Sequence, residues 1–198
     1  MGRIACGAAL RGPTADARRN HDHILATARV VLTEQGVQAS LRDVARRAGV
    51  GLGTLYRHFP TRDALLEALL RQGFDRLAER ADELAADLPP AAALGAWLRE
   101  LAAGAGVYQG LSGSLVARLH DPESALSASC TALHAAGGRL LASAQADGRI
   151  RKDVAGIDVF ALATAVAAVT ERGPLAERRD QLLNVVLDGL RPEAPRRP

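Results

Sequence analysis

Three glycines at alternate positions stand just before a run of side chains that can bind phosphate or nucleic-acid bases. The stretch AGVGLGTLYRHFPTRDAL, residues 48–65, places Gly49, Gly51 and Gly53 ahead of an aromatic residue, an arginine, a histidine and a second aromatic residue at 56–59. The N–H groups of a glycine-rich loop can cradle a phosphate. Arginine and tyrosine side chains on a short helix can instead contact the phosphates and base edges of DNA. The elements around the stretch decide between these two chemistries.

The residues before Gly49 predict helices, whereas a phosphate-binding glycine loop follows a strand. Residues 16–35 carry apolar side chains at helical spacing, and Gly36 stands where a helix commonly ends. Ser40 then begins a short helix, with Asp43 three residues later as in a capping box. The first helix turns inward Ile24, Ala28, Val31 and Leu32, and the second turns inward Leu41, Val44, Ala45 and Ala48.

The helix-turn-helix interpretation fits the spacing around Gly49, and the phosphate-loop interpretation fails. There is no preceding strand, and no Lys-Ser/Thr pair follows the glycines. Two short helices around a tight glycine turn, packed on a longer first helix, predict a helix-turn-helix. Ala45 is the small residue where the helices touch, Gly49 permits the left-handed turn, and Leu55 anchors the second helix, 52–59, in the core.

The composition bounds the class of protein. The chain has 198 residues, of which 48% are hydrophobic and only 3% aromatic, and alanine and leucine prevail. Both are strong helix formers, so we predict an all-α fold. No apolar run reaches the roughly 18 residues that a membrane span needs, and the first twelve residues lack the apolar core of a secretory signal. Cys6 and Cys130 lie far apart without metal-ligand spacing. We therefore expect a reduced, cytoplasmic protein with no metal, no cofactor and no membrane partner.

The charge is unevenly distributed along the chain. Residues 1–62 hold ten arginines and four acidic residues, a local charge of +6, so the remainder carries −3 of the total of +3. A basic first third joined to a slightly acidic remainder suggests a module for a polyanion and a second module of another kind. The alternative is surface charge that is simply scattered.

The rest of the chain predicts further helices. The segment DLPPAAA at 87–93 ends a long helix that follows Pro60, and it marks a module boundary. Gly, Pro or Asp separate most of the later helices, which we expect at 91–108, 111–120, 123–147, 155–172 and 175–190. The total is about nine helices, flanked by a disordered arm at 1–13 and a disordered tail at 192–198.

One long stretch resembles a known family. The segment ILATARVVLTEQGVQASLRDVARRAGVGLGTLYRHFPTRDALLEALL, from Ile24 to Leu70, is similar to the N-terminal DNA-binding domain of the TetR (tetracycline-repressor) family of bacterial regulators. The resemblance implies a helix-turn-helix DNA-binding domain at 14–62, a connecting helix at 63–88, and a helical ligand-binding and dimerisation domain at 89–191. Gly51 departs from the family pattern, which often has a serine there that can contact phosphate.

Two sets of DNA-contacting residues are expected. The resemblance places six residues of the second helix of the motif at or near the DNA, namely Leu52, Gly53, Thr54, Tyr56, Arg57 and His58. Three more residues lie at helix starts, where N–H groups and guanidiniums hold phosphates, namely Ser40, Arg42 and Arg62. The alternative for the arginines is a solvated face, which Arg46 and Arg47 fit better.

A set of bulky side chains in the later helices predicts an effector pocket between the connecting helix and the helices behind it. The expected lining is Phe74, Trp97, Leu101, Tyr108, Cys130, His134 and Phe160. Tyrosine and tryptophan combine a large apolar body with one hydrogen-bonding tip, which suits a flat or apolar ligand. The alternative is that these residues only fill the core. Cys130 and His134 share a helix face, but a metal would need two further ligands.

The last two helices predict association with a second copy. The helix at 155–172 has small side chains nearly all round, and Leu182, Val186 and Leu190 form a stripe on the final helix. The family resemblance then implies a dimeric, ligand-responsive regulator of transcription, a repressor that a small molecule releases from an inverted-repeat operator in double-stranded DNA. We expect no enzyme activity. The alternatives are a small-molecule-binding protein or enzyme on the same fold without operator function, and an activator or architectural DNA binder.

Overall fold

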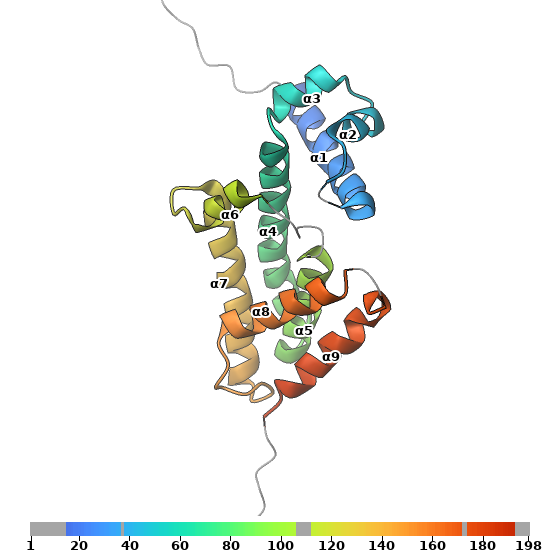
Figure 1. Cartoon of the computed structure of the whole chain (residues 1–198). Helices are drawn as coiled ribbons and strands as arrows, with labels where there is room; N and C mark the ends of the chain where they lie inside the picture. The colour runs from blue at the N-terminus through green and yellow to red at the C-terminus, as the bar shows by residue number, and fades with distance from the viewer. Residues whose placement is uncertain (1–14, 37, 106–111, 172–173, 193–198) are drawn as a thin grey trace, which may run out of the picture. The chain divides into compact units, whose positions relative to one another are not determined.

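The chain folds into helices throughout the part that the structure describes. This structure is a computed structural model, and it describes residues 15–36, 38–105, 112–171 and 174–192. Every regular element in these ranges is a helix, which confirms the all-α prediction (Figure 1). The elements are α1 (Ala15–Gln35), α2 (Leu41–Arg47), α3 (Leu52–His58), α4 (Arg62–Asp87), α5 (Pro90–Ala105), α6 (Gly113–His120), α7 (Ala125–Ala146), α8 (Gly156–Val169), the 3-10 turn η2 (Ala176–Arg178) and α9 (Arg179–Gly189).

The chain divides into two compact units at the junction of Thr61 and Arg62. The first unit contains α1, α2 and α3. Gly36, with φ of 78°, ends α1 as its position predicts. Apolar side chains of all three helices are buried in this unit, among them Ile24, Ala28, Val31, Val44, Ala45, Leu55 and Phe59. The helices around Gly49 are therefore held by an apolar core that the sequence periodicity predicted.

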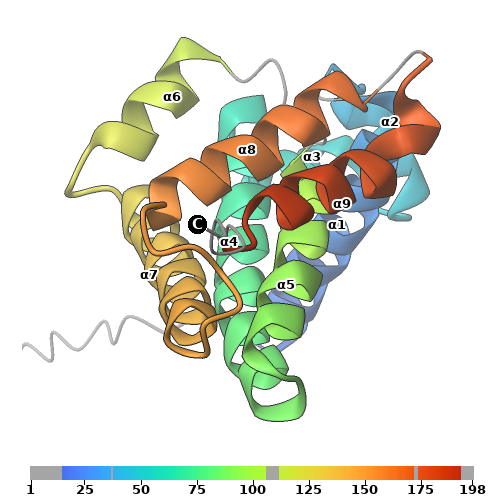
Figure 2. The same ribbon diagram turned by 90° about the horizontal axis from the view of Figure 1, so that it is seen from below.

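The second unit is built on α4, α5 and α7, which contact one another along their lengths. Figure 2 shows these three helices as neighbours, with α8 and α9 running across them. The core between them is almost entirely alanine and leucine, with Trp97 as its largest side chain. Ser112 caps α6 by accepting a hydrogen bond from Leu115, and its hydroxyl also donates to Asp63 at the start of α4 at 2.9 Å. Hydrogen bonds from Ser114 and Ser112 lower the pKa of Asp63.

The loop between α7 and α8 is held by a small hydrogen-bond network. Gly148, with φ of 72°, ends α7, and the N–H of Arg149 returns to the carbonyl of Ala144 at 3.2 Å. The Gln145 amide donates to the carbonyls of Arg151 and Val154, both at 3.0 Å. The N–H of Arg151 donates to the carbonyl of Leu190 at 2.8 Å. The end of α9 is thus fastened to the α7–α8 loop.

The observed helices differ from the expected ones mainly at their ends. The helix expected from residue 175 begins as the 3-10 turn η2, and α9 follows from Arg179. A 3-10 turn is a common way to begin a helix. α8 ends at Val169, before the expected boundary at 172. The expected arm at 1–13 and most of the expected tail at 192–198 lie outside the described residues, as do residues 106–108 of the helix expected at 91–108.

Candidate functional site

The turn between α2 and α3 is fixed by backbone geometry. Gly49 has φ of 66°, the left-handed conformation that the sequence predicted. The N–H of Val50 donates to the carbonyl of Ala45 at 3.0 Å, and the N–H of Gly49 donates to Arg46 at 3.2 Å. This pair of bonds is a Schellman motif, which satisfies the last carbonyls of α2. The direction in which α3 leaves the turn is therefore set by local contacts.

The two motif helices begin with different caps, and the first departs from the expected capping box in one detail. Ser40 caps α2 by accepting a hydrogen bond from the N–H of Arg42 at 3.2 Å. The Asp43 carboxylate does not complete the expected capping box, because it accepts hydrogen bonds from Gln35, at 2.9 Å, and from Arg46. These bonds, the one from Arg46 first, lower the pKa of Asp43. α3 begins at Gly51, which has no side chain to cap it.

The outer face of α3 carries the side chains expected to contact DNA. Leu55 is completely buried, and this fixes which face of α3 points outward. Tyr56 is 44% exposed, and Gly53 and Arg57 are also exposed. The Arg57 guanidinium donates to the Thr54 hydroxyl at 2.9 Å, one turn earlier on the same face. The other expected residues of this helix, Leu52 and His58, are half-buried.

The arginines around α2 fall into two groups. Arg47 donates to Glu34 of α1 through both terminal nitrogens, one of the bonds measuring 3.2 Å, and Arg46 pairs with Asp43. The hydrogen bond from Arg47 lowers the pKa of Glu34. Arg42 is exposed and makes no ion pair with the residues that the structure describes. Of these three cations, Arg42 is the one whose guanidinium is not already paired with a carboxylate. Arg62, also expected at phosphate, is half-buried as the first residue of α4 in the second unit.

Two histidines of α1 hold the ends of the motif helices, which sequence reasoning did not foresee. The His23 ring lies 3.1 Å from the Ala48 carbonyl at the end of α2. The His21 ring packs on Phe59, with 4.8 Å between ring centroids, and is 6.1 Å from the ring of His58. Their spacing of two predicts that they point apart, and each indeed serves a different helix. The only feature of the sequence that could have indicated this role is that both histidines lie in α1, the helix on which the motif packs.

Three of the residues expected around an effector line one cavity in the second unit. Trp97 of α5, His134 of α7 and Phe160 of α8 border a hollow of about 190 Å³. Leu94, Leu141 and Val159 are further parts of its wall, which is contributed by α5, α7 and α8. The His134 and Phe160 rings meet edge to face, with centroids 4.3 Å apart. Burial lowers the pKa of His134.

The other residues expected around an effector do not line this cavity. Leu101 is 3% exposed and packs in the core, and Phe74 of α4 packs against the same core. Cys130 is half-buried one turn before His134, and burial raises the pKa of its thiol. Tyr108 lies outside the described residues. The cavity was expected beside the connecting helix, but α4 contributes no residue to its wall.

The Trp97 ring packs into a notch in α7 that exists because residue 137 is glycine. A Cβ atom at Gly137 would lie 2.5 Å from the indole carbon Cη2, a distance that no real contact allows. The indole N–H donates to the Leu77 carbonyl of α4 at 2.8 Å. The polar tip expected to orient a ligand is therefore used inside the protein. Trp97 joins α5 to α4 and offers only its apolar face to the cavity.

The outer face of α8 is apolar and exposed, whereas α9 exposes Val185 among polar side chains. On α8 only Val159, Ala163 and Ala167 are buried. Large apolar side chains point outward from both helices, with Ile157 60%, Leu162 44%, Val169 53% and Val185 65% exposed. Leu182 and Val186 of the expected stripe are half-buried. Leu190 is 4% exposed and belongs to the core of its own chain, so it does not continue that stripe on the surface.

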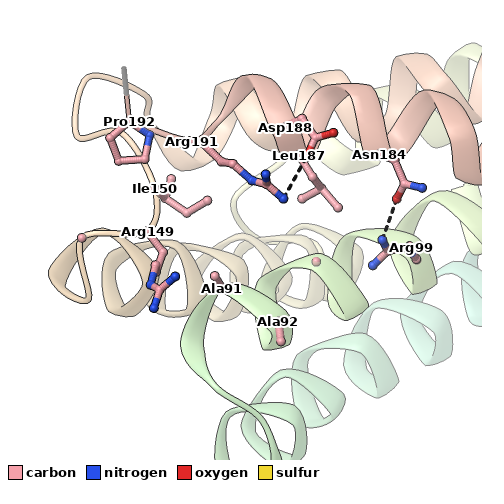
Figure 3. A pocket seen from close by; sticks show the side chains of 12 residues that line it. Ala91, Ala92, Arg99, Arg149, Ile150, Asn184, Leu187, Asp188, Arg191 and Pro192 are labelled. Atoms are coloured by element: carbon pink, nitrogen blue, oxygen red, sulfur yellow. Dashed lines mark hydrogen bonds and ion pairs between the residues drawn. The ribbon is translucent and has the colours of Figure 1, made fainter. Parts of the chain in front are cut away.

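A larger, open groove of about 950 Å³ lies between the start of α5, the α7–α8 loop and the end of α9. Figure 3 shows two pairs among its polar side chains: Arg99 donates to Asn184 at 2.8 Å, and Arg191 pairs with Asp188 at 3.0 Å. Within the described ranges, no three His, Cys, Asp or Glu side chains lie close enough to hold a metal ion. None of the helices described is both long and apolar enough to cross a membrane.

Comparison with known proteins agrees with this architecture. The family model for bacterial regulatory proteins of the tetR family matches residues 24–69, and the model for the C-terminal domain of SbtR-like transcriptional regulators matches residues 89–192. The chain belongs to the TetR family of transcriptional regulators, with a DNA-binding helix-turn-helix in its first unit.

Individual relatives cover different shares of the chain. A TetR transcriptional regulator from Streptomyces coelicolor is 41% identical, with a TM-score of 0.71 over 88% of this chain and 99% of its own. A TetR regulatory protein from Mycobacterium vanbaalenii is 35% identical, with a TM-score of 0.66 over 90% and 98%. The transcriptional repressor KstR of Mycolicibacterium smegmatis is 36% identical over 69 residues, 34% of each chain.

Proposed function

We propose that the protein is a dimeric repressor whose two helix-turn-helix units bind an inverted-repeat operator and are released from it by a small molecule. The observation that carries this proposal is the outer face of α3. Its exposed Tyr56 and Arg57 stand on a helix whose direction is set by the Gly49 turn and whose inner face is anchored by Leu55. Side chains held in this way can read DNA with little loss of conformational freedom.

The contacts divide by chemistry into base-reading and phosphate-holding. Tyr56 and Arg57 reach base edges in the major groove, and the Thr54 hydroxyl orients Arg57. Gly53 has nothing within 4 Å of a Cβ position, so the DNA backbone can approach it closely. Ser40, Arg42 and Arg62 hold phosphates, and Leu52 and His58 border the contact surface.

The exposed apolar face of α8 and the exposed Val185 of α9 support dimerisation through these helices. Leu162 of α8 and Val185 of α9 would be costly to leave in water, and a second copy would cover them. Two-fold symmetry also presents two α3 helices to half-sites about 34 Å apart. Leu182 and Val186 belong to this interface in the proposal, whereas Leu190 supports it from within the core.

The effector part of the proposal places a small molecule in the cavity lined by Trp97, His134 and Phe160. A ligand that fits one arrangement of the helices better than another shifts the population toward that arrangement. If the two α3 helices of a dimer no longer match successive grooves, both half-site contacts are lost together. The repressor role follows the relative KstR, which is named a repressor and is 36% identical over 69 residues.

The test is footprinting of the purified protein on the DNA upstream of its own gene. We expect protection of an inverted repeat, with an affinity that falls steeply as salt concentration rises because arginines displace counterions from phosphates. A footprint that spans two half-sites supports the dimer, and relief of transcription on disrupting the repeat supports repression. No duplex binding at low salt would favour the alternative, a small-molecule-binding protein or enzyme that keeps the fold without an operator.

A further inference from the structure

The size of the cavity between α5, α7 and α8 restricts which ligands can fit. Its volume is about 190 Å³. Engineered protein cavities of about 150 Å³ bind benzene, whereas pockets for drug-sized ligands usually measure about 300–1,000 Å³. A single aromatic ring with one or two substituent atoms would fill the cavity. A steroid nucleus or a long acyl chain is too large for it.

The cavity wall limits the polarity of an occupant. Apart from His134, the side chains that line it are apolar. The Trp97 N–H, which is the other polar group near the wall, is engaged by the Leu77 carbonyl at 2.8 Å. His134 lies edge-on against Phe160, and partial burial lowers the pKa of its ring, which favours the neutral form. A charged ligand would lose its hydration without gaining a counter-ion.

We infer that this cavity binds a neutral, single-ring apolar molecule that carries at most one hydrogen-bonding group, and that the group faces His134. The inference rests on the proposed function, in which the occupant of this cavity is the effector. The ring lies against the apolar face of the Trp97 indole and beside Phe160. Ile157, which is 60% exposed, stands at the mouth of the cavity.

Trp97 gives such a ligand a direct connection to α4. The indole contacts the cavity on one side, and its N–H holds the α4 backbone at Leu77 on the other. The Gly137 notch leaves the indole no room to retreat toward α7. A ring that presses on the indole therefore strains the bond to α4, the helix that continues directly from the first unit at Arg62.

The experiment uses the full chain and the fluorescence of Trp97, which is the only tryptophan. The probes are toluene and phenol, with benzoate as a charged ring of similar size and palmitate as a long chain. We expect toluene and phenol to change the Trp97 emission saturably, and to raise the folding equilibrium constant about elevenfold at ten times their dissociation constant. Benzoate and palmitate should do neither at the same concentrations.

Three variants assign the binding to this cavity. Val159→Phe fills the cavity from its buried wall, and Ile157→Phe narrows the mouth at an exposed position where folding is not at risk. Val116→Phe, on the exposed face of α6, is the matched control. We expect toluene affinity to fall at least about tenfold in either cavity variant and to stay unchanged in the control.

Two results would overturn the inference. One is that neither toluene nor phenol affects the emission or the thermal unfolding. The other is that both cavity variants bind toluene as the natural chain does. Operator footprinting on the same samples separates this failure from failure of the proposed function: a chain that keeps its operator but ignores the rings loses only this inference. A chain that binds the rings but no duplex retains the cavity assignment and loses the proposed function.

Discussion

The two units hold their candidate functional groups in opposite ways. In the first unit, Tyr56 and Arg57 point into solvent, and the backbone turn at Gly49 and the anchor Leu55 determine where they stand. In the second unit, the candidate residue Trp97 faces inward, and its position depends on contacts between distant helices, with Gly137 of α7 and Leu77 of α4. Substitutions on the outer face of α3 should therefore change DNA affinity without changing the free energy of unfolding. Substitutions around Trp97 should change ligand affinity and the free energy of unfolding together.

The second unit contains two hollows that differ in size and in polarity. The groove between α5 and α9 is about five times larger than the cavity, but two of its three arginines are engaged within the same chain, Arg99 by Asn184 and Arg191 by Asp188. The small cavity has an apolar wall and one neutral histidine. Judged by volume alone, the groove would be the ligand site. The cavity is the better ligand site because its wall is mostly apolar.

The largest effect is expected from a charge on the exposed apolar surface of the second unit. Val186→Asp should convert dimers into monomers at micromolar concentration, because an unpaired buried charge costs several kcal/mol. Analytical ultracentrifugation measures the change. Val116→Asp on α6, exposed at 43%, is the control and should leave the sedimentation unaltered. A variant that sediments like the natural chain would remove Val186 from the interface.

Substitutions on the outer face of α3 should lower operator affinity without lowering the stability of the fold. Tyr56→Ala and Arg57→Ala are each expected to weaken operator binding by about 1–3 kcal/mol, since each removes a base or phosphate contact. Circular dichroism and thermal unfolding should stay close to those of the natural chain, because neither side chain is buried. Fluorescence anisotropy with a labelled operator gives the affinities. Full affinity in both variants would be incompatible with α3 as the reading helix.

Neighbouring glycines of α7 should respond with opposite signs. Gly137→Ala is expected to lower the free energy of unfolding by about 1–3 kcal/mol, because the new methyl group meets the Trp97 ring at 2.5 Å. Gly138→Ala has nothing within 4 Å of its Cβ position and should gain up to about 1 kcal/mol from helix propensity. Urea titrations measure both. Equal effects at the two positions would show that the notch does not determine the packing.

Arginines of the first unit should differ according to their partners. Arg42→Ala is expected to weaken specific and random duplexes by similar factors and to flatten the salt dependence of log K by about one unit. Arg47→Ala is the matched control, and it should change the slope less because Glu34 already holds that guanidinium. Affinities at four salt concentrations decide the matter. A change in sequence preference for Arg42→Ala would place that residue among the reading contacts.

The smallest effect concerns His134 and pH. Burial lowers the pKa of His134 in the folded chain, so the unfolded chain takes up a proton first as the pH falls. The free energy of unfolding should therefore be highest above pH of about 6.5, and decrease below it until the folded-state pKa is passed. The difference between the natural chain and His134→Leu, measured between pH 8 and pH 5, isolates this contribution. An unchanging difference would mean that His134 is fully hydrated in the folded state.

The first unit could be predicted closely from the sequence because its determinants are local. A glycine at the turn, a small Ala45, an anchoring Leu55 and a serine cap lie within sixteen residues, and the structure contains each of them as predicted. The reciprocal half of the capping box was wrong, because Asp43 is drawn to Gln35 and Arg46. That competition depends on the distant α1, which a spacing rule does not include.

The second unit could be predicted as helices but not as a site. Periodicity placed Trp97 and Leu101 on one face, and both are indeed buried, yet only Trp97 reaches the cavity. Val159 and Ile157 were missed as lining residues because their role depends on how α8 crosses α5 and α7. Leu190 was assigned to a helical stripe, but α9 ends at Gly189, and the periodicity does not apply beyond the last turn.

The bond between the Arg151 N–H and the Leu190 carbonyl has a consequence for shortened forms of the chain. A stop codon after residue 192 would leave this fastening and the buried Leu190 side chain intact. A stop codon before residue 190 would remove both at once and leave Gln145 to hold the α7–α8 loop without them. Truncations from the C-terminal side should therefore become abruptly damaging once they remove residue 190, because one cut then abolishes a backbone hydrogen bond and a core contact together.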